Sequence, residues 1–256
     1  DRGREAPPIK LLKKGDPARP GEVVPFAHQS YVSSLDRIVP AAPAESKTSG
    51  RRLALASWIT DPKNPLTARV LVNRVWQYHF GFGLVRTPDN FGFTGEKPTH
   101  PELLDWLAND FTTHGRTTKR LHKLILLSDT YRQSSGHPKQ DEYAKRDAAN
   151  RFWWHAERRR LDAETLRDSL LKAGGQLKLE PIGGPSFLPV IAPDALEGLS
   201  TKTAAWKPSP PEQQGRRSVY IFAKRGLLPP LLTTFDFPDT TLPSCRRDET
   251  TVPTQS

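Results

Sequence analysis

The polar side chains best suited to chemistry are concentrated in residues 64–80, where apolar residues recur with helical spacing. Arg69 and Asn73 are four residues apart and therefore share a helix face, and Arg74 lies next to them. An arginine beside an asparagine could bind a carboxylate, sulfate or phosphate through paired hydrogen bonds. The same side chains could instead satisfy backbone carbonyls of the glycine-rich segment that follows. We favour this structural role, because buried polar groups require hydrogen-bond partners.

Four other residues could contact a ligand, and each also has a structural interpretation. His100 falls in the first turn of an expected helix, where the positive helix end would keep an imidazole neutral, but packing is its commoner role. Arg132 ends another expected helix, beside serine hydroxyls that lack the surroundings of an activated nucleophile. Trp153 and Trp154, near the basic run 158–160, could stack on sugars or bases. Aromatic pairs more often pack at the edge of a core.

Several kinds of site lack their sequence signatures. The histidines show no H-E-x-x-H spacing, so no metal site is predicted, and neither glycine-rich phosphate-binding motif occurs. The single cysteine, Cys245, excludes an internal disulfide and a zinc site built on paired cysteines, and we interpret it as a buried apolar residue. The haem-attachment motif C-x-x-C-H is absent too. No catalytic residue is identified, and no cofactor is expected in this segment.

The chain is basic, with 38 Lys and Arg against 28 Asp and Glu and a net charge of +10. Such a charge favours polyanions, including nucleic acids and acidic polysaccharides. The basic residues are nevertheless scattered in pairs, apart from the triple 158–160, so a solvated basic surface is the simpler interpretation and a nucleic-acid partner is not favoured. The longest apolar runs, such as 124–127, are far shorter than the roughly 20 residues of a membrane helix. No membrane span is predicted.

The spacing of apolar residues predicts a mainly helical fold, with an antiparallel, bundle-like core and long ordered loops. Asn64 followed by a proline is typical of a helix start, and Thr99 with Glu102 forms the capping box of another helix. Helices are expected over 51–59, 64–80, 99–115, 118–132 and 162–174. Alternating apolar residues predict a minor β element near 217–222.

The sequence also predicts how the chain is divided. Residues 1–49 carry many prolines and no sustained periodicity, which predicts an extended connector from a preceding domain. Residues 50–256 are expected to form one domain. Its final stretch is rich in Pro and Thr and contains no helix signal, so we expect this domain to be truncated at its C-terminus.

Several distinctive sequence blocks follow one another between residues 50 and 256. In chain order they are RLALASWITDPKNPLTARVLVNRVWQYHFGFGLVRTPDNFG, HPELLDWLANDF, KLILLSDTYRQSS, RRRLDAETLRDSLL, GGPS, RRSVY and FDFPD with a following CRR. These blocks resemble those of the C-terminal domain of a planctomycete protein family of unknown function. The earlier stretch LLKKGDPARPGEVVP resembles the link by which a preceding domain joins this domain in the family.

The resemblance implies a large exported protein in which a second uncharacterised domain, and often a cytochrome c-like domain, precedes this one. It therefore implies an extracytoplasmic location, in the periplasm or at the cell surface. It also implies haem c in an upstream domain, and contact between this segment and the upstream domain of the same polypeptide. The family supplies no catalytic residues.

A structural and interaction module is the first hypothesis that these features support. The alternative is binding or degradation of an acidic or sulfated polysaccharide. In that case Arg69, Asn73 and Arg74 would neutralise anions, while Trp153 and Trp154 would stack on sugars. A second alternative, non-specific nucleic-acid binding, depends on the net charge alone.

Overall fold

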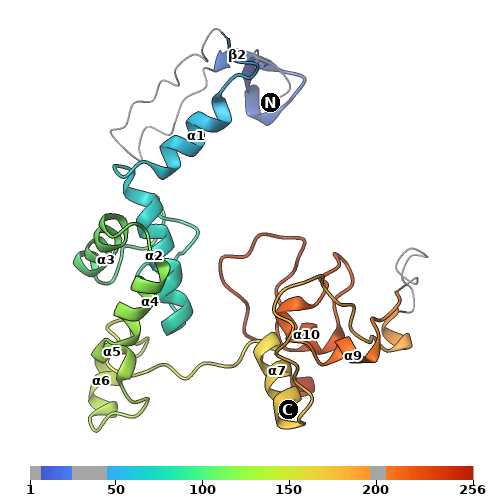
Figure 1. Ribbon diagram of the computed structural model, residues 1–256. Coiled ribbons are helices and arrows are strands. Elements are labelled where there is room, and N and C mark those ends of the chain that lie inside the picture. Colours follow the sequence, from blue (N-terminus) through green and yellow to red (C-terminus); the bar gives the residue numbers. More distant parts are fainter. Residues whose placement is uncertain (1–6, 25–44, 197–205, 256) are drawn as a thin grey trace. The chain divides into compact units, whose positions relative to one another are not determined.

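The computed structural model describes residues 7–24, 45–196 and 206–255. The chain divides into two compact units, which meet in the sequence between Glu157 and Arg158. We call them the N-terminal unit and the C-terminal unit. The described residues are mainly helical, which confirms the predicted fold class, and a two-stranded antiparallel sheet accompanies the helices (Figure 1).

The elements are as follows. The N-terminal unit contains β1 (Ile9–Leu12), the 3₁₀ helix η1 (Lys13–Gly15), β2 (Pro20–Val24) and the helices α1 (Arg51–Thr60), α2 (Pro65–Phe80), α3 (Pro101–Thr113), α4 (Thr118–Leu126), α5 (Asp129–Arg132) and α6 (Gln140–Arg146). The C-terminal unit contains α7 (Ala163–Ala173), η2 (Pro193–Leu196), α9 (Pro211–Gln214), η3 (Ser218–Tyr220), α10 (Pro230–Thr234) and η4 (Pro253–Gln255). None of the helices in the described parts has the length and apolar character needed to cross a membrane.

β1 and β2 form an antiparallel hairpin, with Ile9 opposite Val24, where the sequence predicted extended connector. The turn is closed locally, because the carboxylate of Asp16 accepts a hydrogen bond from the amide of Ala18 (2.9 Å). The prolines are compatible with this pairing, because Pro17 lies in the turn and Pro20 is the first residue of β2. Most of the remaining connector, residues 1–6 and 25–44, lies outside the described residues.

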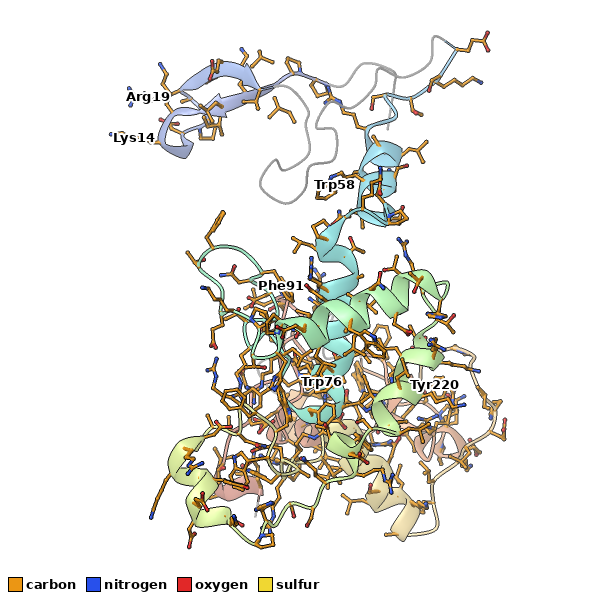
Figure 2. All side chains as sticks on the ribbon, turned by 90° about the vertical axis from the view of Figure 1, so that its left-hand side faces the viewer. Lys14, Arg19, Trp58, Trp76, Phe91 and Tyr220 are labelled. Carbon is orange, nitrogen blue, oxygen red and sulfur yellow. The ribbon has the colours of Figure 1, made fainter. Side chains whose placement is uncertain are left out.

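Helices α2, α3 and α4 pack on one another around the core of the N-terminal unit. α2 begins as predicted: the side chain of Asn64 accepts a hydrogen bond from the amide of Leu66 (3.1 Å), and a proline takes the first helical position. On its buried face Trp76 stacks on Phe80, with ring centroids 4.3 Å apart. Figure 2 labels Trp76 on α2 and, separately, Lys14 and Arg19 at the hairpin turn. The buried apolar residues of this core are Val72, Trp76, Phe80, Leu84, Val85, Leu104, Leu107, Phe111, Leu121, Ile125 and Trp153.

α3 starts one residue later than its capping box predicts. The N-cap is His100, which makes no side-chain capping bond, and Pro101 is the first helical residue. Thr99 does not cap the helix, because both its amide (2.9 Å) and its hydroxyl (3.3 Å) donate to the carbonyl of Leu84. The threonine therefore fixes the preceding loop to the core.

The single helix predicted over 118–132 is interrupted. α4 ends at Leu126, and Ser128 then caps the short helix α5 by accepting a hydrogen bond from the amide of Tyr131 (3.2 Å). The hydroxyl of Ser128 also donates to the carbonyl of Ile125 (2.7 Å). A serine hydroxyl that binds nearby backbone competes with helix propagation, which explains the break.

The C-terminal unit has its own core. α7 starts at the predicted cap, where Asp162 accepts a hydrogen bond from the amide of Thr165 (2.8 Å). Phe187 and Leu232 are fully buried, and α7 contacts both η3 and α10. A second small cluster consists of Ile191, Trp206 and Leu227.

The β element predicted near 217–222 does not form a strand. The structure has the 3₁₀ helix η3 there, followed by one isolated parallel bridge between Phe187 and Ile221. A distant side chain contributes to this: Asp168 of α7 accepts hydrogen bonds from both the amide (2.8 Å) and the hydroxyl (2.7 Å) of Ser218. The first of these bonds occupies the backbone amide of Ser218, which is then unavailable to a strand ladder.

Candidate functional site

The candidate site is a groove in the N-terminal unit between α2 and the loop over residues 82–98. Asn73 holds the start of this loop: its amide nitrogen donates to the carbonyl of Val85 (3.0 Å), and the amide of Val85 donates back to its oxygen (2.8 Å). The side chain of Asn73 is fully buried. A Cβ on Gly83 would lie 2.5 Å from this side chain, so only glycine fits there. Asn73 thus has the structural role that its position favoured.

The rest of the loop is fixed by its own side chains. The hydroxyl of Thr87 donates to the carbonyl of Asn90 (2.9 Å) and accepts from the amide of Glu96 (3.0 Å). The side chain of Asn90 accepts from the amide of Gly92 (3.1 Å). At Gly95 the chain approaches itself so closely that a Cβ would lie 2.0 Å from the carbonyl oxygen of Asn90. The loop is therefore held by hydrogen bonds and close backbone contacts of its own.

The groove has a volume of about 710 Å³, which is within the usual range of ligand sites. Its apolar lining includes Leu66 and Val70 on α2 and Phe91 and Phe93 on the loop. Figure 2 shows Phe91 on the loop that runs beside α2. Residues of α2 and of the loop belong to the same core cluster, which supports both walls of the groove.

The rim of the groove carries both signs of charge. Arg74 and Lys97 supply positive charge, and Asp89 and Glu96 supply negative charge. The carboxylate of Glu96 accepts a hydrogen bond from Arg151 (2.8 Å), which offsets part of its charge. Neither sign dominates, so the rim does not by itself select a polyanion.

The structure separates the three polar residues that the sequence placed together on α2. Arg69 turns to α3, where its Nε donates to Asp105 (2.6 Å) and lowers the pKa of that carboxyl. It also donates to the carbonyl of Pro65 (2.9 Å). Asn73 points into the core, and only Arg74 lines the groove. A single anion site made of all three residues is not assembled.

Of the other candidate residues, Trp153 belongs to the core and His100 packs against it. Trp153 is only 7% exposed and meets Trp76 edge-on, with ring centroids 5.5 Å apart. Its faces are consequently unavailable for stacking on a sugar. His100 packs against Trp153 (5.4 Å) and Phe152 (5.7 Å), and its Nδ1 lies 3.0 Å from the hydroxyl of Thr99.

The remaining two candidates lie elsewhere in the N-terminal unit. Trp154 is half-buried; its indole nitrogen donates to the carbonyl of Asp147 (3.0 Å), and its ring contacts Tyr143 and His155. Arg132 is exposed at the end of α5, 3.9 Å from Asp129. Neither residue lines the groove.

Two polar groupings were missed by sequence reasoning. In the C-terminal unit, Arg167 donates to the hydroxyl of Ser218 (3.1 Å), which itself donates to Asp168, and burial lowers the pKa of Arg167. Ser218 is buried, so this network holds η3 against α7. The other grouping is a pair of histidines, His79 and His122, which are 43 residues apart and meet only when α2 packs near α4. No local sequence pattern predicts either contact, because the partners are far apart in the sequence.

A family model matches residues 51–256, from the first residue of α1 through the rest of the chain. It describes the PSD1 family, "Protein of unknown function (DUF1553)". The chain belongs to this family. The groove, α2 and the whole C-terminal unit lie inside the matched range of the PSD1 domain. The chain matches none of the curated proteins and none of the solved structures.

Proposed function

We propose that this PSD1 chain is a structural and interaction module that binds an extended polypeptide segment in the groove beside α2. The observation that supports the proposal is the preformed loop over residues 82–98, which creates an apolar groove with charges of both signs at its rim. A preformed site lowers the ordering cost of binding, which favours recognition of a flexible partner.

The chemistry of the rim favours a polypeptide over a polyanion. An apolar side chain of the partner would contact Val70 and Phe91, while its acidic and basic neighbours would pair with Arg74 and Asp89. A sulfated polysaccharide or a nucleic acid would be attracted by Arg74 and Lys97 but repelled by Asp89, so the rim gives a polyanion no clear advantage. The net charge of +10 belongs to the chain as a whole, and the groove does not share its sign.

The setting of the module is also part of the proposal. The resemblance to exported multidomain proteins supports an extracytoplasmic location and a neighbouring domain with haem c. The upstream domain of the same polypeptide is then the most direct source of the bound segment, because a tether raises its effective concentration.

The test is a selection of short random peptides on the full chain, with counter-selection on Arg74→Glu. Affinities of the selected peptides are then measured by fluorescence polarisation. We expect Arg74→Glu and Lys97→Glu each to weaken binding about tenfold, since each reverses a rim charge. Lys119→Glu, an equally exposed change on α4 outside the groove, serves as the matched control and should leave affinity unchanged.

Heparin, dextran and duplex DNA are measured in parallel on the same variants. The proposal fails if no peptide is enriched on the wild type over the variant, or if selected peptides bind Arg74→Glu as well as the wild type. If heparin binding survives moderate salt and is lost in Arg74→Glu, the ligand of the groove is a polysaccharide and not a polypeptide.

A further inference from the structure

Two imidazoles from different helices face each other in the N-terminal unit. The Nε2 of His79 on α2 lies 2.7 Å from the Nδ1 of His122 on α4. Their ring centroids are 5.0 Å apart, and the rings are inclined by 70°. At this separation one nitrogen donates and the other accepts, so a single proton lies between two ring nitrogens.

We propose that His79 and His122 form a binding site for one divalent transition-metal ion, with Zn²⁺ as the reference ion and water completing its coordination. A zinc ion sits about 2.0–2.1 Å from each imidazole nitrogen in near-tetrahedral geometry, which places the two nitrogens roughly 3.3 Å apart. The two nitrogens would therefore separate by about 0.6 Å as the ion takes the place of the shared proton. A small rotation of one exposed side chain provides that movement. The ring that donated this proton then carries it on its other nitrogen, after exchange with solvent, and binds the ion as a neutral imidazole.

The surroundings of the pair support metal binding. His122 is exposed and His79 is half-buried, so an ion can reach both rings from solvent. Tyr131 packs edge-on against His79 with ring centroids 5.6 Å apart, which limits the freedom of that imidazole. Imidazole ligands favour Zn²⁺, Cu²⁺ and Ni²⁺ over Mg²⁺ and Ca²⁺.

The number of ligands predicts the kind of site. Within the described parts of the chain, no three residues among His, Cys, Asp and Glu are placed to hold one ion together. A structural zinc site uses four protein ligands, whereas this one would supply two. The bound ion would therefore keep open positions and exchange with solvent, as an accessory or regulatory ion does.

The test uses the full chain without an affinity tag and titrates it with zinc sulfate. Equilibrium dialysis gives the stoichiometry, and long-range ¹H–¹⁵N NMR spectra of the imidazoles show which rings bind. We expect one zinc ion per chain, with shifts confined to His79 and His122, and no effect of Mg²⁺ at equal concentration. Zinc should also raise the melting temperature, because the ion binds the folded state.

Variants separate ligation from the loss of a hydrogen bond. His122→Ala should weaken zinc binding about tenfold or more, since it removes one of two ligands. His122→Gln can still hydrogen-bond to His79 but supplies no imidazole, and it should lose zinc binding to the same degree. His114→Ala and Cys245→Ser control for zinc bound by an exposed histidine elsewhere and by the thiol. Unchanged zinc binding in His122→Ala, or no binding by the wild type, would overturn the proposal.

Discussion

Asn73 shows how one side chain fixes the shape of the candidate site. Its two hydrogen bonds go to the same residue, Val85, and it is fully buried. Truncating it would leave both backbone groups of Val85 without partners in the core, which is more costly than losing a solvated hydrogen bond. Asn73, which the sequence analysis considered for anion binding, thus determines the geometry of the loop.

Replacing Asn73 by alanine should lower the free energy of unfolding by about 2–3 kcal/mol, because two buried backbone groups lose their partners. Urea unfolding followed by tryptophan fluorescence measures the change. The matched control is Asn109→Ala on the exposed face of α3, which should change the free energy of unfolding by no more than about 0.5 kcal/mol. If the two substitutions lower the free energy of unfolding equally, the buried hydrogen bonds of Asn73 do not stabilise the fold.

At the scale of the elements, the loop over residues 82–98 packs closely against α2. Gly83 passes the side chain of Asn73 and the carbonyl of Val85, and a Cβ would lie within 2.6 Å of both. Gly83→Ala should therefore destabilise the chain by about 1–3 kcal/mol through overpacking, and weaken any peptide bound in the groove. Gly136→Ala is the control, since nothing lies within 4 Å of a Cβ there. Thermal melting of both variants, followed by circular dichroism, makes the comparison, and equal melting temperatures would contradict it.

The contact between α3 and α4 should make stability depend on pH. Arg120 donates two hydrogen bonds to Asp110 (2.9 and 2.8 Å), and these lower the pKa of the Asp110 carboxyl. Because the folded-state pKa lies below the unfolded one, the stabilising contribution is complete above the unfolded value. It is lost as the pH falls through the folded value.

The expected result is a gap in urea midpoint between the wild type and Arg120→Met that is present at about pH 6 and shrinks at about pH 3. Arg132→Met is the control, because Arg132 is exposed and lies 3.9 Å from Asp129. The urea midpoint of this variant should differ little from that of the wild type at either pH. A gap for Arg120→Met that stays constant with pH would exclude the carboxyl as its cause.

The sequence predicted the elements whose causes are local. Asn64 and Asp162 cap their helices as expected, since a cap needs only the next two or three residues. Near 217–222 the structure has η3 and a β-bridge at Ile221 in place of the expected strand, and Asp168, fifty residues away, binds the backbone of Ser218. No pattern within a short window contains that information.

The candidate site could be predicted only in part for the same reason. Helical spacing placed Arg69 and Asn73 on one face, but it could not show that the first turns to Asp105 and the second to the loop. The burial of Trp153 against Trp76 likewise depends on how distant segments pack. Arg74 is the one predicted residue of α2 that lines the groove.

The whole molecule has two units with separate cores, and this should be visible in how the chain unfolds. Phe187 is fully buried in the C-terminal unit. Phe187→Ala should destabilise that unit by about 3–5 kcal/mol and leave the N-terminal unit unchanged. Hydrogen exchange followed by mass spectrometry should show faster exchange in α7 and normal exchange in α2. Phe222→Ala, which alters a partly exposed ring, is the control. Faster exchange in α2 as well would mean that the units unfold together.

The internal hydrogen bonds of the groove loop, from Thr87 and Asn90, also have a consequence for rates. If the groove needs no conformational change before it binds, the association rate constant should fall in the ordinary range for protein complexes. Substitutions at the rim would then alter mainly the lifetime of the complex, and the dissociation rate constant would carry the differences in affinity.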